Sequence, residues 1–221
     1  MPFAARHRRD PVPSLEPLAG LVVRREEDAT RMASLQSRAE DEMTRRFADG
    51  HRAYVAWRDD TPAAWGWVAT RVAEIGELGS AFSIPPGERY LWNFVTRAAH
   101  RGLGIYPRLL DAIVRAESRG ASPAERFWIA YAPENHASGA GIRKAGFVAL
   151  AELSFDATGR AALQGLVPGG GRVASRVLGL PEAHDALAPC WRCVRAGRGS
   201  MSCAPTSCRC DYQVPTSGCA A

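Results

Sequence analysis

Residues 90–106 read YLWNFVTRAAHRGLGIY and predict a β-strand, a glycine-containing turn and the start of an α-helix. The apolar run from Tyr90 to Thr96 is typical of a buried strand, and apolar residues recur at helical spacing from Gly102 to Glu117. Glycines let a backbone turn tightly, and the free N–H groups at a helix N-terminus attract anions such as phosphate. The stretch therefore indicates an anion-binding unit, although Gly-x-Gly also occurs in turns that need only its geometry.

The sequence on both sides of this stretch predicts the other elements of an α/β domain. Apolar periodicity and turn residues set their bounds. The expected elements are a strand over 21–24, an amphipathic helix over 26–47, hairpin strands over 53–57 and 63–72, a long loop over 74–89 with a short strand at 81–84, a strand over 127–131, a helix over 136–145 and a strand over 147–155. Their order predicts a mixed sheet with a crossover helix.

A second motif, NHASGAGIRKAGF, begins at Asn135 and ends at Phe147. Together the two motifs resemble the GNAT N-acetyltransferase superfamily. Arg101 and Gly104 match its pyrophosphate motif, Arg/Gln-x-x-Gly-x-Gly/Ala, and the second motif matches its later Asn-…-Lys-x-Gly-Phe block. The resemblance covers about residues 20–156 and implies a GNAT-like domain, in which a mixed, mostly antiparallel central sheet is flanked by helices.

The resemblance also implies acetyl-CoA as cosubstrate and direct attack of a neutral amine on its thioester. Backbone amides of the glycine turn would hold the pyrophosphate, with a positive charge from Arg101. The end of the central strand would pair with the pantetheine arm and polarise the thioester carbonyl through one N–H group. Asn135 would hydrogen-bond the arm. The expected cofactor residues are Phe94, Val95, Thr96, Arg101, Gly102, Leu103, Gly104, Ile105, Tyr106, Asn135 and Ser138.

Three positions depart from the family pattern. Tyr106 stands where Gly or Ala is commoner, and Pro107 after it lacks an N–H group. Many members carry a tyrosine as general acid seven residues after the asparagine, where this chain has Ile142. Tyr131 and His136 could take that role; the alternatives are a core strand residue and an exposed residue at a helix start.

The general base is sought in the loop before the central strand and beside the turn. Glu88 is the carboxylate we expect to take the proton of the amine, if burial raises its pKa. The same residue could instead be a surface charge. Further candidates are Glu74, Glu77, Asn93 acting through a water molecule, and His100.

Composition and charge limit the classes of partner that we expect for the chain. The net charge is +5, and all the basic residues except Lys144 are arginines, scattered rather than clustered. This pattern disfavours nucleic acid as a partner. The longest apolar runs are too short to cross a bilayer. We expect a small-molecule or peptide amine as acceptor and no membrane partner, and strands near the last β segment could pair in a homodimer.

The ends of the chain are expected to differ from the domain at 20–156. Residues 1–19 are rich in Pro and Arg and predict a flexible arm, and 157–189 predict a linker with short helices. All six cysteines lie within 190–221, so the cysteine-free body indicates a cytoplasmic protein. The tail suggests a thiolate site, most simply zinc, with an iron–sulfur cluster or an unstructured tail as alternatives. The expected ligands are Cys190, Cys193, Cys203, Cys208 and Cys210.

The sequence thus predicts a transferase that moves an acetyl group from acetyl-CoA to a primary amine. One alternative is an acyl-CoA-binding GNAT-fold protein with little catalysis, which Ile142 favours. The other is an adaptor that acts through a zinc-binding tail.

Overall fold

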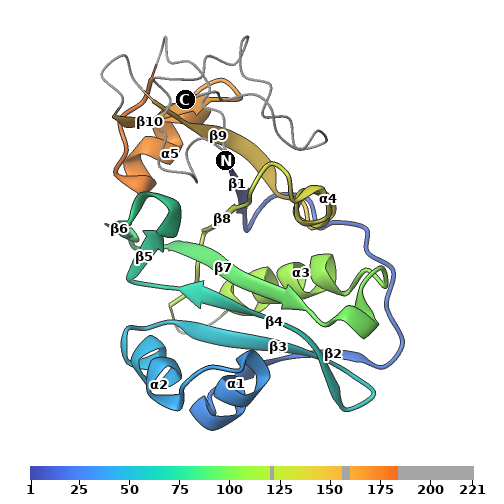
Figure 1. Cartoon of the computed structure of the whole chain (residues 1–221). Coiled ribbons are helices and arrows are strands. Elements are labelled where there is room, and N and C mark those ends of the chain that lie inside the picture. The colour runs from blue at the N-terminus through green and yellow to red at the C-terminus, as the bar shows by residue number, and fades with distance from the viewer. Residues whose placement is uncertain (120–121, 156–159, 184–221) are drawn as a thin grey trace, which may run out of the picture.

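One sheet of eight strands organises the chain (Figure 1). The computed structural model describes residues 1–119, 122–155 and 160–183. The strand order is β10-β9-β1-β8-β7-β4-β3-β2, with β7 and β8 parallel and the other neighbours antiparallel. This confirms the mixed, mostly antiparallel sheet. The strands are β1 (Pro2–His7), β2 (Leu21–Glu26), β3 (Arg52–Arg58), β4 (Thr61–Ala69), β7 (Glu88–Thr96), β8 (Arg126–Ala130), β9 (Val148–Phe155) and β10 (Ala161–Gly165).

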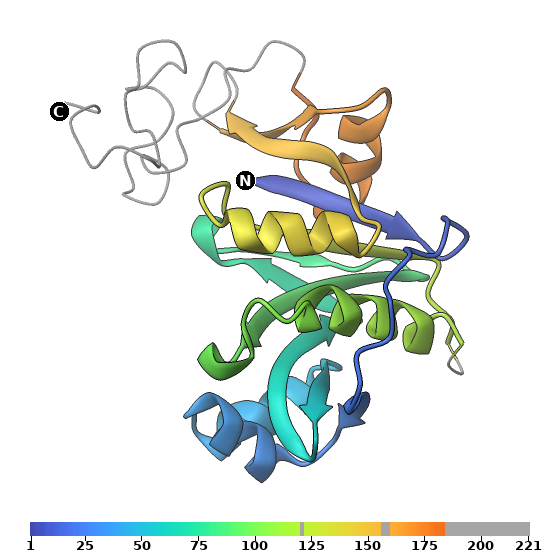
Figure 2. The same ribbon diagram turned by 90° about the vertical axis from the view of Figure 1, so that its right-hand side faces the viewer.

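Helices cover both faces of the sheet (Figures 1 and 2). Side chains alternate along each strand, so Leu91 and Ile129 pack with α3 and α4, whereas Tyr90 and Trp128 belong to the core on the other face. That other face carries α1, α2 and α5 together with the small hairpin of β5 and β6. The remaining elements are α1 (Ala29–Gln36), α2 (Glu40–Ala48), β5 (Val72–Ile75), η1 (Gly76–Leu78), β6 (Ser80–Ser83), η2 (Ala98–His100), α3 (Ile105–Glu117), α4 (His136–Lys144) and α5 (Gly170–Leu178).

The single helix expected over 26–47 is wrong, because the segment forms two helices. Asp28 caps α1 through its side chain, and Ser37 ends α1 in a left-handed conformation with φ 51°. Ala39 is extended before α2 begins. The apolar spacing runs through the break, since both helices pack the same face against the sheet.

The flexible arm expected over 1–19 is wrong in its first part. Residues 2–7 form β1, which lies between β8 and β9 with Phe3 fully buried. Phe3 pairs with Ala130 on one side and Ala151 on the other. The strand escaped prediction because its partners lie more than a hundred residues away, and its short apolar run stands among Pro and Arg.

The linker expected over 157–189 is also corrected. Its described residues extend the sheet by β10, which pairs with β9, and add one helix, α5, packed on these two strands. The expected cysteine site at 190–221 lies outside the described residues. Within them, no group of His, Cys, Asp and Glu could hold a metal ion.

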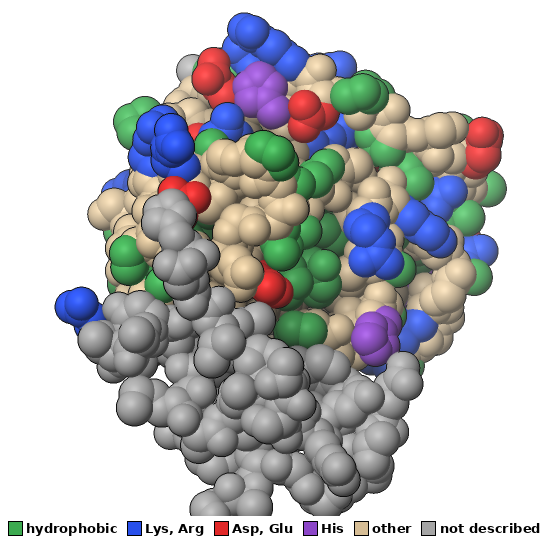
Figure 3. Space-filling view, turned by 90° about the horizontal axis from the view of Figure 1, so that it is seen from above, with side chains coloured by type: hydrophobic (Ala, Val, Ile, Leu, Met, Phe, Trp, Pro, Cys, Tyr) green, Lys and Arg blue, Asp and Glu red, His purple; other side chains and the backbone are tan. Residues whose placement is uncertain are grey.

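The surface seen from above carries its basic side chains in several separate groups, interrupted by acidic and apolar ones (Figure 3). Among the helices of the described residues, none has the length and apolar character needed to cross a membrane.

A buried carboxylate joins α3 to the sheet. Glu117, in the last turn of α3, accepts hydrogen bonds from Arg52 at 2.6 Å, Tyr54 at 2.7 Å and Arg89 at 3.1 Å. The Glu117 side chain is 1% exposed and that of Arg89 is 5% exposed. Three donors therefore compensate one desolvated charge, and α3 is fixed against β3 and β7.

We expect Glu117→Ala to lower the free energy of unfolding by about 3–5 kcal/mol, because Arg89 would be left buried without its partner. Glu117→Gln keeps an acceptor oxygen and should lose less. Urea denaturation measures both. Glu125→Ala, at an exposed ion pair with Arg8, is the control and should change stability by less than about 1 kcal/mol. Equal effects at the two sites would contradict this role.

Candidate active site

Strand β7 contains a bulge just beyond its last pair with β8. The two strands pair from Glu88 to Leu91 of β7, and β7 then continues to Thr96 without β8. At this point Asn93 has φ 53°, a left-handed conformation. The register with β4 shifts between Trp65 and Trp67, so two residues of β7 face one residue of β4.

The residue facing the bulge is Gly66. A Cβ atom there would lie 2.1 Å from the ring of Phe94, so no larger residue fits without displacing the ring. The Arg97 N–H donates to Ala63 O at 2.9 Å. Because hydrogen-bonded pairs alternate along an antiparallel ladder, the peptide groups of Thr96 point away from β4, into the space that β8 has left. Strand β7 thus offers an open edge.

A glycine turn faces this open edge. Gly102 and Gly104 have φ 79° and 70°, conformations that favour glycine, and Gly104 precedes α3 without a side-chain cap. The first amides of α3, those of Ile105 and Tyr106, have no carbonyl partner within the helix. Together with the positive end of the helix dipole, such amides can bind an anion, and we call this turn the anion cradle.

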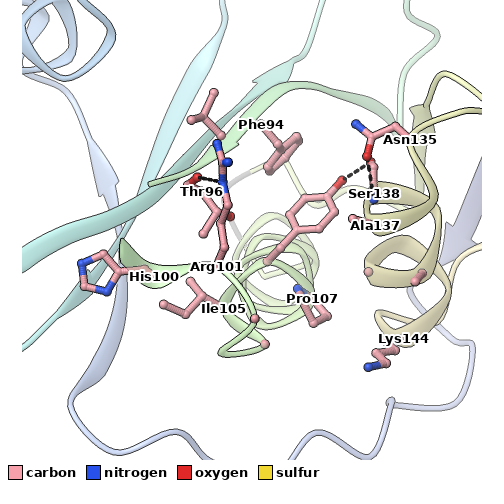
Figure 4. Close-up of a pocket in the computed structure, with 16 residues that line it drawn as sticks. Phe94, Thr96, His100, Arg101, Ile105, Pro107, Asn135, Ala137, Ser138 and Lys144 are labelled. Atoms are coloured by element: carbon pink, nitrogen blue, oxygen red, sulfur yellow. Dashed lines mark hydrogen bonds between the residues drawn. The ribbon is translucent and has the colours of Figure 1, made fainter. Parts of the chain in front are cut away.

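Helix α4 provides the third wall. Asn135 caps it, since its side-chain oxygen accepts the Ser138 N–H at 3.0 Å. The Asn135 amide nitrogen takes no part in this cap. Asn135 and Ser138 lie together at the start of α4, and Lys144 lies at its other end (Figure 4).

These three parts line one pocket of about 620 Å³. Every expected cofactor residue except Leu103 lines it; Leu103 is 39% exposed. Arg101 lies beside Thr96 and donates to its carbonyl oxygen at 3.2 Å (Figure 4). The lining residues, all among those described, include no carboxylate. Lining residues that the expected set left out are His100, Pro107, Ala137, Ala140, Gly141 and Lys144.

Part of this missing set follows from helical spacing. One face of α4 carries residues spaced three or four apart, and these are Ala137, Gly141 and Lys144. This is the face of α4 that lines the pocket. His100 ends the short η2 turn, and its Nδ1 atom is buried without a hydrogen-bond partner among the described residues.

The expected catalytic residues lie outside the pocket lining. Glu88 begins β7, about 26 Å of extended strand before Thr96. Its carboxylate accepts the Trp128 indole N–H at 2.7 Å and pairs with Arg126 at 3.5 Å. Glu88 therefore makes structural contacts outside the pocket lining, and its role as a base stays a prediction.

The two expected acids both lie at α4, Tyr131 packed against it and His136 at its start. The ring of Tyr131 packs on Gly139, where a Cβ atom would lie 2.8 Å from Tyr131 Cε2. His136 is the exposed first residue of α4. Ile142, the position of the usual acid, is buried and apolar.

Gln36, the last residue of α1, holds the bulge from the face of the sheet opposite to Phe94. Its side-chain oxygen accepts hydrogen bonds from Asn93 at 3.2 Å and Trp67 at 3.3 Å. The guanidinium of Arg46 lies 4.6 Å from the ring centre of Trp92 and 5.1 Å from that of Trp67, a cation–π arrangement. The helices α1 and α2 are thus tied to the strand that opens the pocket.

Comparisons with known proteins give one family match and several similar solved structures. Residues 21–147 match the model of the acetyltransferase (GNAT) family. No curated protein sequence matches the chain. Similar solved structures include a GCN5-related N-acetyltransferase from Kribbella flavida, with TM-score 0.46, 17% identity and coverage of 67% of this chain and 53% of that one.

Two further structures are similar. An acetyltransferase of this family from Novosphingobium aromaticivorans has TM-score 0.43, 23% identity and coverage of 67% and 59%. One from Streptococcus pneumoniae has TM-score 0.43, 13% identity and coverage of 65% and 98%. The chain thus spans between half and three fifths of the length of the first two structures.

We expect Asn93→Val to lower the free energy of unfolding by about 1–3 kcal/mol, because a β-branched residue is strained in the left-handed conformation. Asn93→Gly accepts this conformation and should stay within about 1 kcal/mol of the parent protein. Urea denaturation distinguishes the two.

Asp60→Val is the matched control, since Asp60 has φ 63° in the turn between β3 and β4, away from the pocket. Both Val variants should be destabilised, but only Asn93→Val should also weaken binding of CoA. Loss of CoA binding in Asp60→Val would contradict a specific role of the bulge.

Proposed function

Because the chain belongs to the GNAT acetyltransferase family, we propose that it transfers an acetyl group from acetyl-CoA to a primary amine of a small-molecule or peptide acceptor. The observation that carries the proposal is one pocket that joins the glycine turn, the open edge of β7 and the Asn135 cap.

The residues present fit acetyl-CoA. The amides of Ile105 and Tyr106 can bind the pyrophosphate, with Arg101 and Lys144 adding positive charge and no lining carboxylate among the described residues opposing it. The Thr96 N–H group, which points away from β4, can pair with the amide-bearing pantetheine arm. Asn135 can bind the same arm through its side-chain nitrogen.

In this proposal the protein contributes orientation and electrostatics. An N–H group at the open end of β7 stabilises the negative charge that develops on the carbonyl oxygen when the amine attacks. Holding amine and thioester together supplies a large part of the rate. His100 is our candidate for taking the amine proton, directly or through water, because it is the titratable side chain of the pocket lining that can accept a proton near neutral pH. Tyr131 and His136 stay as proposed acids.

A second candidate function is binding of acyl-CoA with little catalysis. Ile142, which is 1% exposed, favours it, because no protic group occupies the usual position of the acid. A thiolate with a pKa near 8.5 can nevertheless leave without a dedicated acid. Release of free thiol from acetyl-CoA with a panel of primary amines separates the two functions.

The proposal is first tested by calorimetric titration of the full chain with acetyl-CoA and with CoA. Saturable binding of both supports the site. Binding without thiol release from any amine would favour the second candidate. Absence of binding to the folded protein would overturn both.

We expect Gly104→Glu to abolish measurable CoA binding, because it places a carboxylate beside the phosphates. Gly104→Ala is the matched control: both variants strain φ 70°, and both place a Cβ atom near the flexible end of Arg108. Glu should weaken binding at least about tenfold more than Ala, which corresponds to 1.4 kcal/mol of repulsion. Equal effects of the two variants would contradict an anion-binding role for the anion cradle.

A further inference from the structure

The ring of Tyr106 spans the pocket between two walls. It packs against Phe94 of β7, with ring centres 5.6 Å apart, and its hydroxyl oxygen lies 3.4 Å from Ser138 Oγ on α4. The dashed line to Ser138 in Figure 4 marks this contact. The large residue that departs from the family pattern therefore points into the site.

Helix α4 has a matching gap. A Cβ atom at Gly141 would lie 2.4 Å from Cδ1 of Tyr106 and 2.9 Å from Cε1. Both are rigid ring atoms, so a larger residue at 141 would push the ring aside. Tyr106 and Gly141 are thus complementary: the side chain added on α3 is matched by one missing on α4.

The hydroxyl of Tyr106 retains hydrogen-bonding capacity. Its contact with Ser138 is longer than the usual 2.5–3.0 Å of a hydrogen bond between hydroxyl groups. Burial raises the pKa of Tyr106 to about 12, so the phenol stays protonated at neutral pH and can donate. A ligand carbonyl would be a better partner than the distant serine.

The position of these side chains in the pocket indicates which part of an elongated ligand they would contact. The neutral groups of Asn135, Ser138 and Tyr106 meet at the start of α4. Lys144 lies about 13 Å along the helix axis from Asn135. An elongated ligand with neutral amides in one part and phosphates in another matches this separation.

We infer that Tyr106 and Ser138 form a subsite for the pantetheine arm, an inference that rests on the proposed function. The phenol donates a hydrogen bond to an amide carbonyl of the arm in exchange for its long contact with Ser138, and its ring, packed against Phe94, lies along the arm. The subsite recognises the arm and not the nucleotide.

The test compares two ligands by calorimetry on the full chain: CoA, and 3′-phosphoadenosine 5′-diphosphate, which keeps the nucleotide and its phosphates but lacks the arm. Tyr106→Phe keeps the ring and removes the hydroxyl. We expect about three- to tenfold weaker binding of CoA, the range of one hydrogen bond, and unchanged binding of the nucleotide. Tyr90→Phe, in the core beside Phe82, is the control and should change neither affinity.

A second variant tests the fit of the ring. Gly141→Ala should weaken CoA binding in the parent protein, and the loss should shrink when Tyr106→Ala is also present, because the clash is then gone. Circular dichroism verifies that each variant is folded.

Three outcomes would overturn the inference. Tyr106→Phe could bind CoA as tightly as the parent protein, or it could lose affinity for both ligands equally, which would locate its role in the anion cradle. If the folded parent protein binds neither ligand, the proposed function fails and the inference fails with it.

Discussion

The left-handed backbone at Asn93 is the constraint on which the pocket depends. Strand β8 ends just after its last pair with β7, and the bulge at Asn93 turns the remaining part of β7 so that its peptide groups stay free on that side. Strain of about 1–3 kcal/mol is typical of such a residue. Here Gly66 makes room for Phe94, and Gln36 holds the Asn93 side chain from the other face. Contacts on both faces of the sheet therefore maintain one open strand edge.

The helices beside this edge are fixed by buried charges. Arg6 of β1 donates to Asp111 of α3 at 2.8 Å and to the carbonyl of Ala145, just after α4, at 3.0 Å. Glu117 anchors the far end of α3 to β3 and β7. Such pairs add little net stability over an apolar core, but losing one partner is costly. They hold the glycine turn and the Asn135 cap at a set separation, which the Tyr106 ring then spans.

Local patterns in the sequence identified most residues that line the pocket, and they also predicted the class of the sheet. The turn at Gly104 and the cap at Asn135 depend on neighbouring residues, so their motifs located most of the pocket. The strand β1 could not be predicted, because its pairing depends on β8 and β9, far along the chain. Gly141 showed no sign of its role, which arises only from the direction of the Tyr106 ring. Glu88 lies outside the pocket lining because the length of β7 separates its two ends.

The interior position of β1 has a consequence for how the chain folds. Residues 2–7 hydrogen-bond with 126–130 and 148–152, so the sheet is continuous only after these distant segments have formed. Contacts of such high sequence separation slow folding, because the loop entropy is lost before the pairing is gained. During synthesis the apolar start of the chain leaves the ribosome long before its partners. An early folding core can be built from β2, β3, β4, α1 and α2, whose contacts are local. Strand β1 can join the sheet only later, when β8 and β9 are available on its two sides.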